Sequence, residues 1–565
     1  MEEKLAEDLL REFKYFLARR SVESEKGCFD EKLGNSVFSK KDLGLEVLTI
    51  VDNAGRDGSD GDAIQKSLDK MNVDIPYYFN FLQEAAKRHE VGIVSIDRLK
   101  RMEDYWNKTI QLFNPRGMIF AAPGDYSISV PILMNKDNVC LTGSGKGTKI
   151  ILDASPIPYD SDGLIVTGSY CEVSNVMLDG SSGANHAGDG VHTRLLQVSA
   201  NTVTRLNKLY LYNAYSRAIE LDNATIVFGT DINVKNAHRG LMTWNSSLPS
   251  DFQGILIKGF TTEDIAENSI DFGGANGVVI SDIDLRNTTC GIVPDASFNL
   301  KVQNGFIDSS NSAVEIVNGS GDSSDIFIKN LRGQKWFSVK SGNSHTMDNI
   351  FFESCESSGS TWRNFIAIMD GGGRLKNIHF IRCHGVNSTL FSNFAAIREN
   401  PSDGILEYIY FKDCVANMAL WCGFEVEGTK NIHLKGCTAS YEDHEGISLT
   451  NCEVGSVIDC VTKNNGQESA YAGIYGRNSF YILVTGCHSF DDQVTKTQHY
   501  GLRTHGVDED TSDYWYVFGN DFRSNKLGAM VLGGEHDYYF ANQGFDYAVF
   551  LEPDIRFPNI TEVGS

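Results

Sequence analysis

Five short stretches decide the fold: AIELD (218–222), GLMTW (240–244), SIDFG (269–273), GIVPD (291–295) and AVEIV (313–317). Each begins with a small residue and then alternates apolar and polar side chains. They start 22, 29, 22 and 22 residues apart, and the pattern returns along the chain from GVHTR (190–194) to GAMVL (528–532). Alternation with a period of two, repeated at a nearly fixed interval, is typical of a solenoid of stacked strands.

A second apolar run follows each of these stretches, as in GVVISDIDL (277–285), NIFFESC (349–355) and NIHFIRC (377–383). A repeat of alternating strands and helices would need an amphipathic helical stretch in each unit, and none is visible here. We therefore predict an all-β fold, a right-handed parallel β-helix. Roughly thirteen to fifteen coils fit between residues 160 and 545, which at about 4.8 Å a coil gives a rod about 65 Å long.

Six cysteines end the second apolar run of successive coils, at spacings of 28, 31, 23, 23 and 27: Cys355, Cys383, Cys414, Cys437, Cys460 and Cys487. These spacings are the coil period itself. Free cysteine packs as a small hydrophobic residue, so we expect an inward ladder of reduced thiols. Neither a CxxC pair nor a Cys/His spacing typical of zinc is present, and we predict no metal site.

The regions before and after the rod differ from it in pattern. Residues 1–50 begin with apolar residues at helical spacing, which predicts an amphipathic helix over residues 1–20. Residues 51–150 hold an entry segment and a second helical stretch over 75–112, which would cap the open strand edges of the first coil. We assign residues 151–545 to the β-helix and residues 546–565 to a C-terminal tail.

Composition excludes several classes of protein. With 50 Lys and Arg against 74 Asp and Glu, the net charge is −24, which argues against a nucleic-acid partner. No apolar run is long enough for a membrane span. GSGKGT (143–148) lacks the Ser or Thr that directly follows GK in a phosphate-binding loop, so we expect no nucleotide or other cofactor. The N-terminus has no apolar signal region, which suits a virion component, a cytoplasmic chain or export by another route.

Several motifs resemble the entry to pectate-lyase-like β-helix proteins: DGSDGDAIQKSLDKM (57–71), RGMIFAAPGDYSI (116–128) and NVCLTGSGKGTKIIL (138–152). The superfamily includes polysaccharide lyases, glycoside hydrolases, uronan epimerases, difructose-forming transferases and phage tailspike depolymerases. The resemblance implies a poly- or oligosaccharide ligand without choosing the reaction. Tailspike-like members assemble as parallel rods, and this similarity together with the helix over residues 1–20 implies a homotrimer.

Outward positions of the repeated strands form columns along one face of the rod, because the inward positions are fixed by the apolar residues. Four acids of these columns are our predicted catalytic residues: Glu220, Asp271, Asp295 and Glu315. Carboxylates two coils apart would lie about 9.6 Å from each other, close to the separation that leaves room for a water between acid and base in inverting glycosidases.

Predicted substrate-binding residues lie beside these acids: Asp222 and Trp244 in the next column, and His192 and Arg194 near the start of the rod. Trp244 would offer a flat apolar face to a sugar ring. A second polar set comes out on the same face further along: Arg398, Glu425, Glu427, Tyr475, Arg477, Arg503 and His505. Tyr and Arg in neighbouring coils resemble the base and carboxylate clamp of a lyase.

The sequence thus predicts an enzyme that cleaves a glycan, by hydrolysis with a carboxylate pair. A lyase acting on a uronate glycan, an intramolecular glycosyl transferase of the difructose-forming type and a non-catalytic glycan-binding rod remain alternatives. YSRAIELD (215–222) lacks the D-P-H of alginate epimerases, and the NTD, DD and GHG motifs of polygalacturonases are missing. No motif of the sequence selects one reaction.

Overall fold

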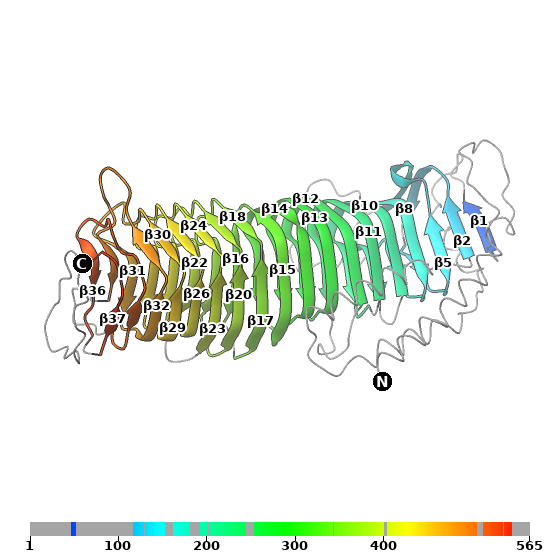
Figure 1. Ribbon diagram of the computed structural model, residues 1–565. Coiled ribbons are helices and arrows are strands. Elements are labelled where there is room, and N and C mark those ends of the chain that lie inside the picture. Colours follow the sequence, from blue (N-terminus) through cyan, green and yellow to red (C-terminus); the bar gives the residue numbers. More distant parts are fainter. Residues whose placement is uncertain are drawn as a thin grey trace, which may run out of the picture.

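The computed structural model describes residues 47–51, 117–128, 130–152, 162–180, 193–199, 203–224, 226–244, 254–342, 344–399, 404–504, 512–534 and 536–544. These residues form a single rod of parallel strands that wind coil upon coil (Figure 1). All 37 strands of the described residues belong to one continuous network of parallel pairs. The predicted all-β fold, a right-handed parallel β-helix, is confirmed.

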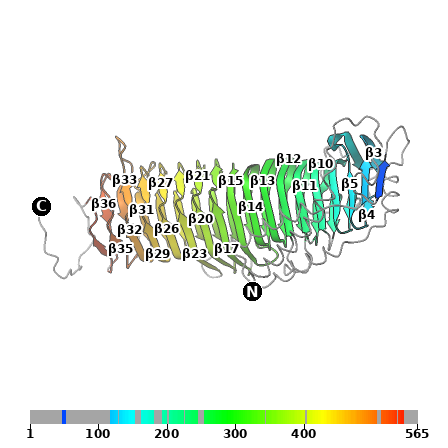
Figure 2. The ribbon, with the colours of Figure 1, turned by 45° about the vertical axis from the view of Figure 1, so that its right-hand side comes forward.

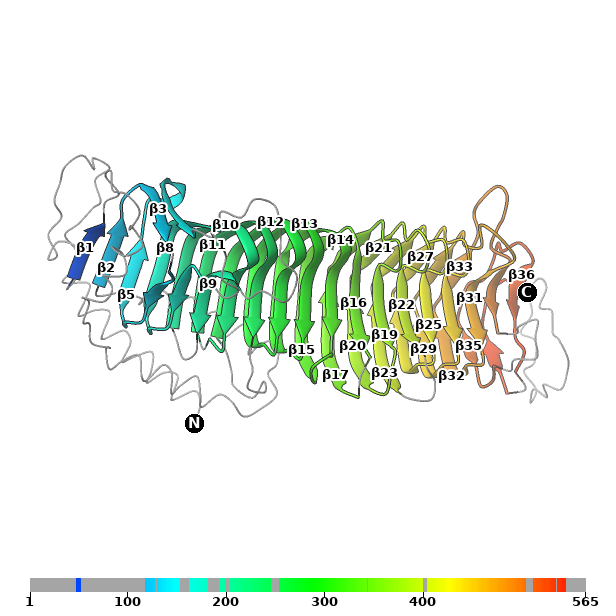
Figure 3. The same ribbon diagram turned by 180° about the vertical axis from the view of Figure 1, so that it is seen from behind.

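Three parallel sheets make up the sides of the rod, as the views from the front, at 45° and from behind show (Figures 1, 2 and 3). The first sheet contains β4 (Ile132–Met134), β7 (Leu164–Val166), β9 (Arg194–Ser199), β16 (Trp336–Ser341), β19 (Phe365–Met369), β22 (Phe394–Arg398), β25 (Phe424–Glu427), β28 (Ile447–Thr450), β31 (Ala472–Arg477), β34 (Tyr500–Arg503) and β36 (Gly528–Val531).

The second and third sheets follow along each coil. The second contains β1 (Val47–Val51), β2 (Gly117–Ala121), β5 (Val139–Thr142), β17 (Thr346–Glu353), β20 (Arg374–Ile381), β23 (Ile405–Lys412), β26 (Lys430–Lys435), β29 (Glu453–Ile458), β32 (Phe480–Thr485), β35 (Tyr516–Phe518) and β37 (Tyr538–Phe540). The third contains β3 (Gly124–Ile128), β6 (Thr148–Leu152), β18 (Glu356–Ser358), β21 (His384–Val386), β24 (Val415–Asn417), β27 (Thr438–Ser440), β30 (Val461–Lys463) and β33 (His488–Phe490).

Seven longer strands bend around the corners and take part in more than one sheet: β8 (Cys171–Asp179), β10 (Val203–Asp222), β11 (Ile226–Trp244), β12 (Gly254–Gly273), β13 (Asn276–Asp295), β14 (Phe298–Val317) and β15 (Ser323–Gly333). Asn and Asp with positive φ make many of these corners, as at Asp282, Asn304 and Asn330. Short polar side chains tolerate the left-handed conformation best, and here they also bond one another, Asn330 Nδ2 donating to Asn304 Oδ1 at 3.1 Å.

Stacked phenylalanines fill the middle of the rod. Phe365, Phe394 and Phe424 lie in successive coils of the first sheet, and their ring centroids are 4.9 and 4.8 Å apart. Phe380 and Phe411, from the second sheet, meet the ring of Phe394 edge to face. All five side chains are buried. Equivalent residues therefore pack on one another along the rod axis, and each coil supports the next.

The predicted ladder of thiols is confirmed. The six cysteines of the coil period are buried and free, namely Cys355, Cys383, Cys414, Cys437, Cys460 and Cys487. Five of their Sγ atoms lie near backbone carbonyls of the preceding coil, as for Cys383 Sγ and the carbonyl oxygen of Phe352 at 3.3 Å. Burial raises the pKa of Cys452, a further interior thiol, to about 12, so this thiol stays protonated at neutral pH.

Parallel pairing begins ahead of residue 151, since β2, β5 and β8 already form three successive rungs of the second sheet. The helices expected over residues 1–20 and 75–112 lie outside the described residues. The domain boundaries and the homotrimer stay predictions. None of the described residues forms a helix with the length and apolarity that crossing a bilayer requires.

The packing predicts a large loss of stability for Phe394→Ala. Removing a ring that contacts four other buried rings leaves a cavity in the middle of the stack, which costs about 3–5 kcal/mol. Thermal unfolding followed by circular dichroism measures the effect against Val494→Ala, a matched truncation of a fully exposed side chain. Equal melting temperatures for the two variants would contradict this account of the core.

Candidate active site on the first sheet

The predicted columns of the first sheet are present. Glu220 pairs in register with Met242, Met242 with Asp271, and Asp271 with Val293. The neighbouring column runs through Asp222, Trp244, Gly273, Asp295 and Val317. Glu315 faces Ser338 of β16, so the acids of β10 to β14 share one face with the strands that follow.

Glu220 is held by two arginines. Its Oε1 accepts a hydrogen bond from Arg194 Nη1 at 2.7 Å, and its Oε2 pairs with Arg217 Nη1. Arg194 also donates from Nε to Asp162 at 2.8 Å. Although Glu220 lies on the outer side of the sheet, its side chain is only 5% exposed, because both arginines cover it. Both carboxylate oxygens are therefore engaged, and the geometry favours a structural ion-pair cluster here.

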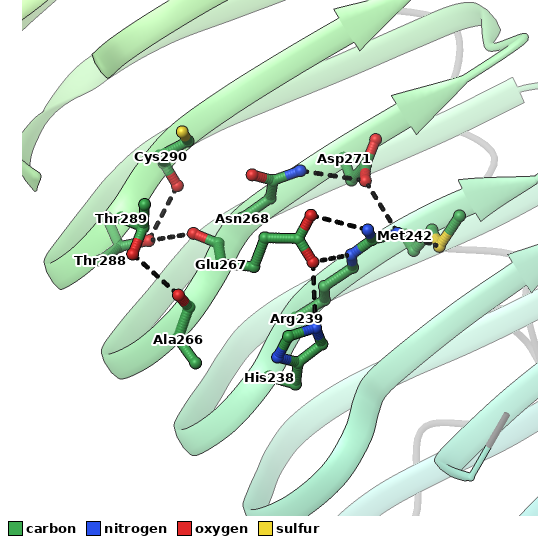
Figure 4. Close-up of polar contacts among 10 residues, drawn as sticks. All are labelled: His238, Arg239, Met242, Ala266, Glu267, Asn268, Asp271, Thr288, Thr289 and Cys290. Carbon is green, nitrogen blue, oxygen red and sulfur yellow. Dashed lines mark hydrogen bonds and ion pairs between the residues drawn. The ribbon is translucent and has the colours of Figure 1, made fainter. Parts of the chain in front are cut away.

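Asp271 lies in a second group of charges (Figure 4). Arg239 binds both oxygens of Glu267, at 2.6 and 2.7 Å, and its Nη1 lies 3.4 Å from Asp271 Oδ2. Asn268 Nδ2 donates to the same Asp271 oxygen at 3.1 Å. Burial raises the pKa of Asp271, and Arg239 opposes this effect. Asp271 is thus partly neutralised by its neighbours.

The other predicted residues of this region are less engaged. Asp295 accepts hydrogen bonds from the backbone and hydroxyl of Ser320, and its charge helps to raise the pKa of Asp271, so these two acids are neighbours. Glu315 accepts from Ser312 Oγ at 3.3 Å. Burial and then the charge of Glu220 raise the pKa of Asp222. His192 and the side chain of Trp244 lie outside the described part of the chain.

A different pair of acids lies further along the same face, on adjacent coils. Glu425 is on β25, and Glu445 lies two residues before the first residue of β28. Two side chains bind the same oxygen of Glu425. Its Oε2 accepts hydrogen bonds from Ser392 Oγ at 2.8 Å and from Arg363 Nη2 at 3.1 Å. None of the described residues donates a hydrogen bond to its Oε1, and the side chain is 18% exposed. Glu425 thus has a fixed carboxylate with one oxygen available.

Glu445 has the opposite environment. The side chain is buried and its Oε2 lies 3.4 Å from the thiol of Cys422. Burial raises the pKa of Glu445 to about 7, and the charge of Glu425 adds to this rise. Cys422 and Arg503 act in the other direction. A carboxylic acid that keeps its proton near neutral pH therefore lies beside a carboxylate that an arginine holds, the arrangement that separates general acid from general base.

Rings flank this acid pair in six successive coils. Each ring stands three residues before an inward residue of its coil, and these inward residues pair in register from coil to coil: Phe365, Phe394, Phe424, Ile447, Ile474 and Leu502. We call the six rings the aromatic column: Trp362, Phe391, Trp421, His444, Tyr471 and His499. The centroid of His444 lies 3.7 Å from that of Trp421 and 4.1 Å from that of Tyr471. Trp421 is 40% exposed and Phe391 37% exposed. The column gives this part of the face an apolar surface that solvent reaches.

Arg363 connects the aromatic column to the acids. Its guanidinium lies 5.4 Å from the ring centroid of Trp362 and 4.7 Å from that of Phe391, while it binds Glu425. Strands β16, β19, β22 and β25, which carry this region, follow one another along the rod in Figure 3. The rings and the carboxylates therefore belong to one surface.

The second polar set of the sequence analysis surrounds the acid pair. Glu427 follows on β25, and burial together with Glu425 raises its pKa. Tyr475 pairs in register with Ser448 and with Arg503, in the column of Glu425. Arg477 pairs with Thr450 in the column of Glu427. Arg398 ends β22, and His505 lies outside the described residues. The described residues hold no group of three or more His, Cys, Asp or Glu arranged for a metal ion.

Sequence reasoning missed Glu445 and the aromatic column, although a signal exists. The tetrapeptides WRNF (362–365), FSNF (391–394), WCGF (421–424), HEGI (444–447), YAGI (471–474) and HYGL (499–502) share one pattern. An aromatic residue is followed after one position by Asn or Gly and then by an inward residue of the strand. Aligning the coils on that inward residue exposes the column.

Comparisons with known proteins found likeness in structure only. No family model matches the chain, and no curated protein matches its sequence. The A-module of mannuronan C-5 epimerase AlgE6 from Azotobacter vinelandii is 12% identical, with 82% of this chain and 98% of that chain covered and a TM-score of 0.26.

Two further solved structures are similar at comparable levels. The catalytic domain of a GH87 α-1,3-glucanase is 12% identical, with 66% of this chain and 64% of that chain covered and a TM-score of 0.34. Tailspike protein 3 of bacteriophage CBA120 is 9% identical, with 76% and 57% covered and a TM-score of 0.29. The assignment of a reaction therefore depends on the chain's own residues.

The buried side chain of Glu442, near the site, predicts that stability depends on pH. Burial raises its pKa to about 8 from 4.5, while the backbone N–H of Ala419 bonds its Oε2. The native state holds the proton more tightly than the unfolded chain, so this contribution to stability is complete below pH 4.5 and is lost as the pH rises through 8.

Glu442→Gln keeps an acceptor for Ala419 but cannot ionise. We expect its melting temperature, relative to the native chain, to rise steadily between pH 5 and pH 8 in differential scanning calorimetry, the window from the cited pKa. Glu468→Gln is the matched control, because it makes the same substitution at an exposed position. A difference between Glu442→Gln and the native chain that does not change with pH contradicts the assignment.

Proposed function

We propose that the protein is a carbohydrate-active enzyme that hydrolyses a glycan bound along the outer face of the first sheet. The observation that carries the proposal is the acid pair, Glu425 and Glu445, beside the aromatic column. Flat rings with exposed faces and edges supply apolar contact area to sugar rings. A carboxyl group whose pKa burial raises to about 7, beside a carboxylate bound by an arginine, can supply the acid and the base of glycoside hydrolysis.

In this proposal Glu445 is the general acid. Its proton passes to the glycosidic oxygen as the bond from that oxygen to the anomeric carbon breaks. Glu425 is the general base: a water gives its proton to the available Oε1 while its oxygen bonds to the anomeric carbon. Arg363 and Ser392 hold Glu425 in place through Oε2. The proton count closes when Glu445 regains a proton and Glu425 loses one to solvent.

The predicted acids Asp271, Asp295 and Glu315 remain a second location for the same chemistry. Asp271 and Asp295 influence each other, but Arg239 and Asn268 already contact Asp271. Both oxygens of Glu220 pair with arginines and the side chain is only 5% exposed, which limits the access of a water to this carboxylate. Glu425 and Glu445 are therefore better suited to hydrolysis than the acids that the sequence analysis predicted.

A lyase is the alternative that a specific observation favours. Tyr475 and Arg503 lie in register on neighbouring coils of the same face, where a tyrosine oxygen and a guanidinium would serve as base and carboxylate clamp for a uronate. Cleavage by this route produces an unsaturated uronate that absorbs in the ultraviolet. Hydrolysis produces reducing ends without that absorbance.

Incubation with a panel of neutral and acidic polysaccharides tests the reaction. We expect new reducing ends without ultraviolet absorbance, and a loss of about 10²–10⁴-fold in kcat/KM for both Glu445→Gln and Glu425→Gln. Asp271→Asn is the comparison variant, and we expect it to keep most of the activity. Complete loss in Asp271→Asn with activity retained in Glu445→Gln would move the site to the other acids. Absorbance that appears together with the ends would establish the lyase.

The aromatic column predicts a separate effect on binding. Trp421→Ala removes a ring that contacts substrate in both the ground and transition states, so KM should rise about 3- to 10-fold with kcat little changed. Tyr516→Ala is the matched control, since Tyr516 is also 40% exposed but lies on the second sheet. An equal KM for both variants would show that the glycan does not touch the column.

A further inference from the structure

One buried cysteine stands apart from the interior thiols. Cys422 is as buried as the ladder cysteines, yet it does not belong to the hydrophobic core cluster that contains Cys414 and Cys437. It lies at the outer side of the first sheet, within the pattern WCGF (421–424), directly after the exposed Trp421. Its side chain therefore faces the acid pair and not the interior of the rod.

The position of Cys422 recurs in each coil. Two residues before the inward residue of the strand stand Arg363, Ser392, Cys422 and Glu445 in successive coils. Arg363 and Ser392 both donate to Glu425. Cys422 lies one coil before Glu445, and the backbone N–H of Gly423 donates to the carbonyl of Glu445 at 3.1 Å. Each acid of the pair thus receives a donor from the coil before it.

The donor types differ between the two acids. Glu425 receives a guanidinium and a hydroxyl, both strong donors to a carboxylate. Glu445 receives a thiol, with Cys422 Sγ 3.4 Å from Glu445 Oε2. Burial, followed by the charges of Glu445 and Glu425, raises the pKa of Cys422 well above its usual value, so the sulfur keeps its hydrogen and can donate. A thiol is a weak donor, and it stabilises an adjacent carboxylate less than a hydroxyl does.

We propose that Cys422 is a positioning residue for the general acid: its S–H holds the Glu445 carboxyl in place and bonds the carboxylate that forms when Glu445 gives up its proton. This inference rests on the proposed function of Glu445. Because the S–H is a weak donor, it orients the Glu445 carboxyl while lowering the pKa of that carboxyl less than a hydroxyl would. Serine at this position would donate a stronger hydrogen bond to the ionised form of Glu445 and so lower the pKa of its carboxyl.

Several other groups lie around Glu445, and they are unchanged when Cys422 is substituted. Arg503 of β34 lowers the pKa of Glu445, and Glu425 of β25 raises it. Tyr471 is close enough that Glu445 helps to raise the pKa of its phenol. Only the Cys422 contact changes in a substitution at that position. A shift of the pH profile that follows the hydrogen-bond donor strength of residue 422 is therefore specific to the contact between Cys422 and Glu445.

The pH dependence of kcat/KM on the cleaved glycan tests the role of Cys422. The general acid must be protonated, so activity declines on the alkaline side through the pKa of Glu445, near 7. Cys422→Ser should move this limb to lower pH and Cys422→Ala to higher pH, each by about 0.5–1 unit. Cys437→Ala, an interior ladder variant, should leave the limb in place. If both Cys422 variants keep the limb of the native enzyme, the proposal is wrong.

A second measurement does not depend on activity. The S–H stretching band that disappears from the infrared spectrum in Cys422→Ala belongs to Cys422. We expect that band to shift as the pH crosses 7, and we expect no shift in Glu445→Gln. A band that does not respond to pH in the native chain would overturn the inference even if the glycan assay succeeds. A responsive band in a chain that cleaves no glycan would preserve the contact and reject the proposed reaction.

Discussion

The rest of the structure depends on one constraint, the stacking of equivalent residues in parallel register from coil to coil. Phe394 packs between Phe365 and Phe424 because each occupies the same place in its coil. The hydrogen bonds of parallel strands fix that place, and a slip of one residue would turn every inward ring toward solvent. The same register orders the outer face, where residues separated by more than twenty positions in sequence become direct neighbours. Chemistry on this protein is therefore arranged in columns along the rod axis.

The columns contain two kinds of charged surface on one sheet. In the coils of β9 to β12, arginines and acids neutralise each other, as Arg194 does for Glu220 and Arg239 for Glu267. In the coils of β19 to β34, the acids are unequal, because an arginine holds Glu425 while burial keeps Glu445 protonated near pH 7. Stability requires only neutralisation, and the first arrangement achieves it. The second places a carboxyl group whose pKa burial raises to about 7 beside a carboxylate bound by an arginine, an arrangement that general acid–base chemistry uses.

Much of the fold could be predicted from the sequence, because period-two alternation and the cysteine spacing both follow the coil. The columns through Glu220, Asp271 and Asp295 followed from the same alternation. The ion pairs of these acids could not be predicted in this way. The pairing of Glu220 with Arg217 depends on how the two side chains bend over the strand, and not on which face of the sheet they occupy. Glu445 escaped notice because it precedes its strand, where alternation no longer determines direction. Its burial and its thiol neighbour arise only when the corners of successive coils are stacked.

The central claim is that a glycan lies on the aromatic column beside Glu425 and Glu445. Binding of the Glu445→Gln protein to a glycan array tests this most directly, because a blocked general acid leaves the ligand intact on the surface. The account predicts selective binding to a polysaccharide, and loss of that binding when Trp421→Ala is added. Binding that survives Trp421→Ala but disappears with changes at Asp271 and Asp295 would contradict it and place the ligand on the other half of the sheet.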